Sequence, residues 1–179
     1  MATRQVAFVR NIMVGREGLT RAVLLRIVAE HGGEDPVSHL TTGNLAFRYP
    51  SRELPTFRRA VEDEIEAILG RREELYIRSV AKLKRMIDSD PFADAPFDNI
   101  QERCVSFARK KFPAVRLPVF SRRKDHAVFR FEGMQAYSVT RLVDGRTSGP
   151  GGTVERLLHG RVTTRSWNTV TKIVRKELA

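Results

Sequence analysis

The sequence has little cysteine and no long hydrophobic run. Cys104 is the only cysteine, so no intramolecular disulfide can form and no paired-cysteine zinc site is indicated. Cys104 lies in a segment typical of a strand, and we expect its thiol to be buried and inert. No apolar run reaches the roughly 18 residues that a membrane-spanning helix needs. Because Arg4 follows closely on Met1, a signal peptide is not indicated either, and we expect a cytoplasmic protein with no membrane partner.

The common catalytic and ligand-binding patterns are also missing. The chain has no HExxH, GxSxG, GxxxxGK[ST] or DxDxDG pattern, and its four histidines (His31, His39, His126 and His159) never fall four residues apart. We therefore predict no metal site and no cofactor, and we assign no catalytic residue. Whether the protein is an enzyme stays open.

Positive charge is abundant and unevenly distributed. The 179 residues carry 32 Lys and Arg against 21 Asp and Glu, a formal net charge of +11. Residues 1–98 hold 15 basic and 15 acidic side chains, whereas residues 99–179 hold 17 and 6. A field of one sign attracts phosphates, nucleic acid or acidic partners. Alternatively, the surplus is a solvated surface rich in arginine.

Hydrophobic periodicity predicts a regular first half. Apolar residues on both faces of 5–12 favour a central strand, and Thr20 is a helix N-cap before a stripe from Val23 to Val28 that Gly32 ends. Short strands at 37–40 and 45–49 form a hairpin; a helix from Phe57 closes at Gly70, and a strand covers 75–78. This β-α-β-β-α-β order is that of ferredoxin-like, split-βαβ domains.

The second half is less regular, but one of its segments resembles a segment of the first half. We expect a helix capped by Ser79, strands at 103–108, 116–120, 127–131, 136–143 and 161–164, and helices at 153–159 and from Ser166 onward. Helix, glycine, strand, Arg-Ser and helix follow one another both at 67–79 and at 157–166. The predicted fold is therefore α+β: two ferredoxin-like halves packed together, residues 1–79 and a basic 80–179, with an internal duplication left open.

A glycine-rich segment before the helix at 153 is a candidate anion site. Backbone N–H groups in such a loop, with a helix N-terminus behind them, can hold an oxyanion. The alternative is a flexible connection with Thr153 as a helix N-cap. The candidate anion-binding residues are Arg146, Ser148, Gly149, Gly151, Gly152 and Thr153.

Two basic triplets are candidates for contacting nucleic acid. They flank strands rich in phenylalanine, and cations beside aromatic faces suit single strands, in which phosphates meet charge and bases stack. The third-strand signature of an RNA-recognition motif is matched by residues 42–49 only at Gly43 and Tyr49, so we reject that motif itself. The triplets are Arg109, Lys110, Lys111 and Arg122, Arg123, Lys124.

Three segments together resemble a bacterial family known as domain of unknown function 1697. Residues 7–15 stand where the family reads LLRGINVGG, residues 42–47 where it reads SGNVVF, and residues 162–173 where it reads ATTRNWRTVTKL. The chain departs from the family at Asn11 and Arg16, where glycine is usual, and at 146–151, where the family often reads RSKLTN. The positions within the family motifs to which no role is assigned are Asn11, Gly15, Gly43, Asn44, Arg165, Trp167 and Thr169.

The resemblance implies an α+β fold of two ferredoxin-like halves and carries no activity with it. We expect a small binding protein whose basic second half meets an anionic partner, either nucleic acid or another polyanion. The alternative is an enzyme or sensor for a small phosphorylated metabolite at residues 145–153. A third interpretation, a protein-interaction module, predicts a large exposed apolar patch.

Overall fold

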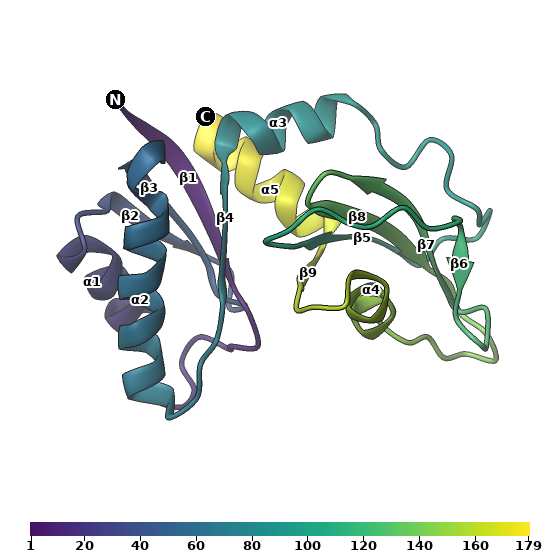
Figure 1. Ribbon diagram of the computed structural model, residues 1–179, viewed down its shortest axis with the longest axis horizontal. Helices are drawn as coiled ribbons and strands as arrows, with labels where there is room; N and C mark the ends of the chain where they lie inside the picture. The colour runs from purple at the N-terminus through teal and green to yellow at the C-terminus, as the bar shows by residue number, and fades with distance from the viewer. The chain divides into compact units, whose positions relative to one another are not determined.

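The computed structural model describes residues 1–179 and divides them into two units, Met1–Lys84 and Arg85–Ala179 (Figure 1). This boundary places Asp88, Asp90, Asp94 and Asp98 in the second unit. Unit 2 thus holds 18 Lys and Arg against 10 Asp and Glu, and unit 1 holds 14 against 11. Unit 2 is still the more basic, but its surplus is smaller than that of residues 99–179 alone.

Unit 1 is a four-stranded antiparallel sheet with two helices. Its elements follow the predicted order: β1 (Ala2–Val9), α1 (Arg21–Glu30), β2 (Glu34–His39), β3 (Asn44–Pro50), a 3₁₀ turn η1 (Ser51–Glu53), α2 (Leu54–Leu69), β4 (Leu75–Ser79) and α3 (Val80–Asp88), which continues into unit 2. The strands lie in the order β2-β3-β1-β4.

The core of unit 1 joins the two helices to one face of this sheet. Leu24, Ile27 and Val28 of α1 and Phe57, Val61 and Ile65 of α2 are all buried, at the helical spacing that the sequence indicates. The Thr20 hydroxyl accepts a hydrogen bond from Val23 N at 3.2 Å, and Gly70 ends α2 with a left-handed φ of 68°. The first strand ends at Val9, because Asn11 turns the chain with φ 51°.

Unit 2 contains a five-stranded antiparallel sheet in the order β6-β7-β8-β5-β9. Its strands and helices are β5 (Glu102–Phe107), β6 (Val119–Phe120), β7 (His126–Glu132), β8 (Gln135–Thr140), α4 (Gly151–Leu158), β9 (Thr163–Ser166) and α5 (Trp167–Leu178). None of the five helices in the chain is long and apolar enough to cross a membrane.

The second unit does not repeat the predicted β-α-β-β-α-β order. Strands β7-β8-β5-β9 are ordered and paired like β2-β3-β1-β4, but between β5 and β7 the chain has residues 108–118 and the short β6 instead of a helix. The expected strand at 116–120 shrinks to two residues, since Pro118 has no N–H to donate. The repeated strand-to-helix junction is present: β4 leads directly into α3, and β9 leads directly into α5, which Ser166 caps.

Register fixes which side chains share a face of the second sheet. Val128 of β7 and Ala136 of β8 pack with Val154 and Leu158 of α4, so these side chains define the α4 face. On β8, Ser138 and Thr140 have the same parity as Ala136 and share that face. The opposite face carries Tyr137, whose ring packs with Phe92 and Trp167.

Candidate functional site

The glycine-rich segment begins as a tight turn rather than as an open phosphate loop. Val143 N donates to Arg146 O at 2.8 Å and Arg146 N returns a bond to Val143 O at 3.1 Å. Asp144 and Gly145 lie between them with φ of 51° and 70°, the geometry of an Asp-Gly hairpin turn. The backbone amide of Arg146 is therefore occupied, and its side chain is exposed.

A buried carboxylate holds the middle of this segment. Asp125, at the start of β7, accepts bonds from Ser121 Oγ at 2.6 Å and from both the backbone N and the Oγ of Ser148 at 2.8 Å. These donors, the Ser121 hydroxyl first, lower the pKa of Asp125 to about 2. Two donors of Ser148 that an external anion would need are thus already bound to a carboxylate within the chain.

His126 connects this carboxylate to helix α4. Its Nδ1 lies 3.0 Å from Ser148 Oγ and its Nε2 lies 2.8 Å from Thr153 Oγ1, and the side chain is buried. Since Ser148 donates its single hydroxyl hydrogen bond to Asp125, its oxygen must accept the hydrogen bond from Nδ1–H of His126. Burial lowers the pKa of His126 and favours the neutral ring, so Nε2 is the acceptor and Thr153 donates to it.

Thr153 is therefore not the helix N-cap that the sequence suggests. Helix α4 begins at Gly151, with Pro150 at the cap position and no side-chain cap bond. Its first turn is glycine-rich, and a Cβ built at Gly152, or at Gly149 before the helix, would meet nothing within 4 Å. The described geometry thus joins Ser148 and Thr153 through His126 and leaves open space beside Gly149 and Gly152.

The α4 face carries further hydroxyl groups next to His126. Thr140 is the direct cross-strand neighbour of His126, and Ser138 that of Val128. Both side chains are buried, yet neither Ser138 Oγ nor Thr140 Oγ1 has a hydrogen-bond partner. An orphaned buried hydroxyl costs about 1–3 kcal/mol, so two together at one place call for an explanation.

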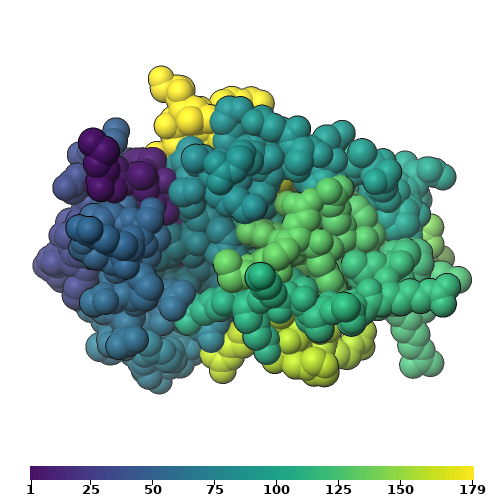
Figure 2. Space-filling view, turned by 45° about the horizontal axis from the view of Figure 1, so that its top comes forward, coloured from purple at the N-terminus to yellow at the C-terminus, as the bar shows by residue number.

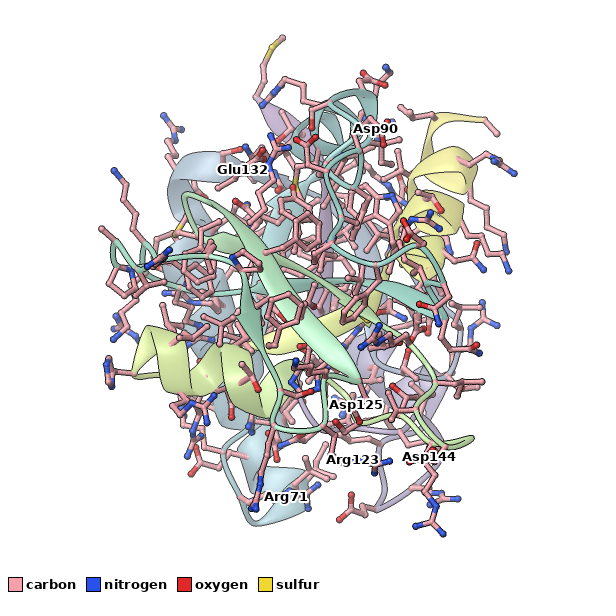
Figure 3. The ribbon with its side chains drawn as sticks, turned by 90° about the vertical axis from the view of Figure 1, so that its right-hand side faces the viewer. Arg71, Asp90, Arg123, Asp125, Glu132 and Asp144 are labelled. Carbon is pink, nitrogen blue, oxygen red and sulfur yellow. The ribbon has the colours of Figure 1, made fainter.

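The two basic triplets lie at opposite ends of the second sheet. Lys110 and its neighbours follow β5 and run beside the β7–β8 turn, where Ala108 N donates to Met134 O and Phe112 N to Gly133 O. The triplet 122–124 precedes β7 at its other end. Figure 3 shows this separation along β7, with Arg123 and Asp125 near one end and Glu132 at the other. Seven strand residues at ~3.3 Å each separate the ends by roughly 20 Å.

An open groove accompanies the first triplet. It has a volume of about 520 Å³ and is lined by Lys111, Phe112, Pro113, Ala114, Val115, Leu117, Phe131 and Gly133. The Phe112 and Phe131 rings stack at 4.4 Å between centroids, with planes 26° apart, and both are half-buried. Figure 2 shows the green segments of unit 2 as an uneven surface from which long side chains stand out.

A second, polar pocket lies where β5, β9 and α5 meet. Its volume is about 400 Å³, and its lining residues are Gln101, Glu102, Arg103, Ser166, Trp167, Asn168 and Thr171. Of the family positions, only Trp167 lines it. Arg165 instead donates to Thr163 Oγ1 and Thr164 O, and burial lowers its pKa to about 10. Thr169 donates its backbone N–H to the Ser166 cap.

The family positions of unit 1 shape turns. A Cβ on Gly43 would lie 2.6 Å from Ile12 Cγ1, and its φ of 68° also requires glycine. Asn44 donates to His39 O at 3.1 Å and to Thr42 Oγ1 at 3.0 Å, closing the β2–β3 turn. Asn11 and Gly15 both have positive φ in the segment after β1. The turns that these four residues form explain their presence, and no ligand has to be assumed.

The remaining reactive groups form no further site. Cys104 is buried as expected, and its pKa is raised to about 12, mainly by burial and also by Glu102. No three side chains among His, Cys, Asp and Glu come together in a way that could hold a metal ion. The Asp125–Ser148–His126–Thr153 chain and the groove at Phe112 are therefore the features with the most defined chemistry.

Comparison with known proteins places the chain in a family. The model of the family described as "Protein of unknown function (DUF1697)" matches residues 2–137. The chain belongs to this family. The match ends before Ser148, Thr153 and the segment 162–173, so these parts lie outside the matched residues.

Similarity to solved structures concerns the fold. The conserved bacterial protein SP0830 from Streptococcus pneumoniae is similar with a TM-score of 0.67 at 15% identity, and 100% of each chain is covered. This DUF1697 chain therefore shares its fold over the full length. A search of curated proteins finds no match.

Proposed function

We propose that this protein binds single-stranded nucleic acid through the groove beside Lys111 of unit 2. The observation that carries the proposal is the direct succession of a basic triplet and an aromatic pair: Arg109-Lys110-Lys111 leads into Phe112, whose ring stacks on Phe131 in an open groove. Non-specific single-strand binding requires both parts, because cations hold phosphates while aromatic side chains stack on bases.

Charge and shape favour this end of the sheet. Lys110 and Lys111 are exposed, and Lys110 Nζ donates to His159 O at 3.0 Å, beside Gly160. The groove continues with apolar residues, including Val115, which is 38% exposed. A strand with its bases turned inward would cover these apolar surfaces while its phosphates face the lysines.

The other triplet supplies a matched control. Arg122 and Lys124 are exposed and basic, as Lys110 and Lys111 are, and Arg123 donates to Val143 O. At physiological salt the Debye length is about 8 Å, so charges roughly 20 Å apart act nearly independently. Two variants with the same loss of charge, K110Q/K111Q and R122Q/K124Q, therefore separate a local site from general cationic attraction.

The experiment is fluorescence anisotropy with a labelled single strand of about 12 nucleotides, titrated at several salt concentrations. We expect K110Q/K111Q to weaken binding and to reduce the salt slope by about 1.4, since each phosphate contact on a single strand contributes about 0.7. Phe112→Leu should weaken binding by about 1–3 kcal/mol, or roughly 5- to 150-fold in Kd, with an unchanged slope. R122Q/K124Q should stay close to the wild type.

Two results would contradict the proposal. One is equal weakening by the two double variants, which would mean that only net charge matters. The other is wild-type binding that is absent or does not depend on salt. Circular dichroism and thermal unfolding of each variant confirm that the fold is kept.

We also propose that both units are forms of one ferredoxin-like α+β unit. The shared strand order and the repeated strand-to-helix junctions at Ser79 and Ser166 support this. Loss of the crossover helix in unit 2 would then have left residues 108–118 free to form the groove.

A further inference from the structure

We propose that Thr153 is a nucleophile activated by His126, and that the site accepts the acyl group of a carboxylic ester. This inference stands on residues at the opposite end of the sheet from the groove, and it does not depend on nucleic-acid binding. A weakly acidic hydroxyl becomes a nucleophile when a neighbouring base takes its proton and a third group orients that base. All three parts are present here.

The direction of the hydrogen bonds favours a catalytic role for Thr153 and His126 over a purely structural hydrogen bond between them. Asp125 accepts a hydrogen bond from the Ser148 hydroxyl, Ser148 Oγ accepts one from Nδ1–H of His126, and Nε2 is left with its lone pair 2.8 Å from Thr153 Oγ1. Asp125 Oδ1 also lies 3.5 Å from Nδ1, so its negative charge stabilises the imidazolium that forms when Nε2 is protonated. The ring is held at both nitrogens and cannot turn away.

The reaction proceeds in two balanced steps. Thr153 Oγ1 attacks the acyl carbon while its proton passes to His126 Nε2; the bond to the leaving oxygen breaks, and that oxygen takes the proton from Nε2 and departs as an alcohol. Water then attacks the acyl-threonine with His126 as base, releasing the acid and restoring the hydroxyl. No oxidant, reductant or metal is needed.

The surroundings of Thr153 supply room and polar groups for such a substrate. Thr153 is partly exposed, and the space beside Gly149 and Gly152 is open. Thr140, directly across from His126 on the same face, keeps a buried hydroxyl with no partner. A bound ester can give this orphan a hydrogen-bond partner. Arg156 on α4, whose charge acts on His126, biases the site toward an ester that carries negative charge.

The chain provides its own control hydroxyl. Thr169 is the third residue of α5, as Thr153 is the third residue of α4, and the Thr169 side chain has no histidine beside it. Both are helix first-turn threonines, so they share backbone setting and differ in the base. Substitution of each by valine keeps the shape of the side chain and removes only the hydroxyl.

The first experiment is labelling of the full chain with a fluorophosphonate probe, followed by peptide mapping. We expect Thr153 to be labelled in the wild type, in Thr153→Ser and in Thr169→Val, and labelling to be lost in Thr153→Val and in His126→Gln. In parallel, release of 4-nitrophenol from an aryl ester should fall on the order of 100-fold in His126→Gln, the usual contribution of a general base.

Absence of label on wild-type Thr153, labelling of Thr169 to the same extent, or labelling that persists in His126→Gln would each overturn the proposal. If His126→Gln fails to fold, the set of Thr153→Ser, Thr153→Val and Thr169→Val still decides it, because none of these removes the buried ring. A failure here leaves nucleic-acid binding untouched, since that assay uses no residue of this site.

Discussion

The two sheets of this protein share a strand order but fill one face in different ways. Beneath its helices unit 1 packs an apolar core of thirteen buried residues, including Phe47, Phe57 and Leu24. The α4 face of unit 2 has a cluster of only six, and beside it stand His126, Thr140 and Ser138. The same backbone pattern thus supports a dense apolar core in one unit and a buried polar network in the other.

This difference indicates where stability and where function are concentrated. Apolar packing is nondirectional and roughly additive in area, whereas a buried polar group is favourable only when its partners are in place. Unsatisfied hydroxyls in unit 2 cost free energy, and proteins keep such costs chiefly at sites that bind or react. Five substitutions and a pH series test this contrast.

The largest effect is expected in the unit 1 core. Phe57 packs on Phe47 at 4.7 Å and on Tyr49 at 4.5 Å between ring centroids, so Phe57→Ala should destabilise by about 3–5 kcal/mol. In unit 2, Leu158→Ala at the end of α4 should cost nearer the lower limit of the ~2–5 kcal/mol range for leucine. Urea unfolding measures the loss of stability in each variant. Equal losses in the two variants would contradict the contrast between the units.

The next largest effect is the loss of stability when the Asp125 carboxylate is removed by substitution or neutralised by acid. Replacing Asp125 by Asn leaves Ser121 and Ser148 without a charged acceptor and should cost about 2–3 kcal/mol at neutral pH. Because its pKa is held at about 2, below the ordinary 3.8, the stabilisation by the wild-type carboxylate is complete above pH 4 and is lost as pH falls toward 2.

His126 causes a further loss of stability, at a higher pH than Asp125 does. Burial and Arg156 lower its pKa below 6.5 while Asp125 opposes them, so the unfolded chain takes up the proton first and stability declines as pH falls below 6.5. Unfolding midpoints measured from pH 7 to pH 2 should show both declines in the wild type. The Asp125→Asn variant should lack the lower one, and an identical profile would exclude this role for Asp125.

The smallest effect has the opposite sign. Thr140→Val replaces a buried hydroxyl that lacks a partner by a methyl group of similar size, so it should stabilise unit 2 by about 1 kcal/mol. The matching change in a satisfied hydroxyl, Thr164→Val, removes the 2.7 Å bond to Ser106 and should destabilise. Thermal unfolding distinguishes them, and a destabilised Thr140→Val would show that this hydroxyl is paired in solution.

Much of unit 1 was predictable because its signals are local. Thr20 and Gly70 mark helix ends where the structure has them, and the apolar spacing of α1 and α2 identifies the buried face. In unit 2 the sequence singled out Ser148 and Thr153 as anion-binding candidates, whereas the structure joins them through Asp125 and His126, which the sequence reasoning missed. The pair stands beside a basic triplet in the sequence, and nothing local indicates that it faces a loop more than twenty residues away.

The amino-acid sequence by itself determined the α+β class, the order of elements in unit 1, the family and the inert state of Cys104, since capping, periodicity and residue type act over a few neighbours. Only the tertiary structure decided that the basic triplets lie apart, that Phe112 meets Phe131, and that Thr153 forms a hydrogen bond with His126. Those facts depend on strand register and on hydrogen-bond direction, and both are fixed only when distant segments pack.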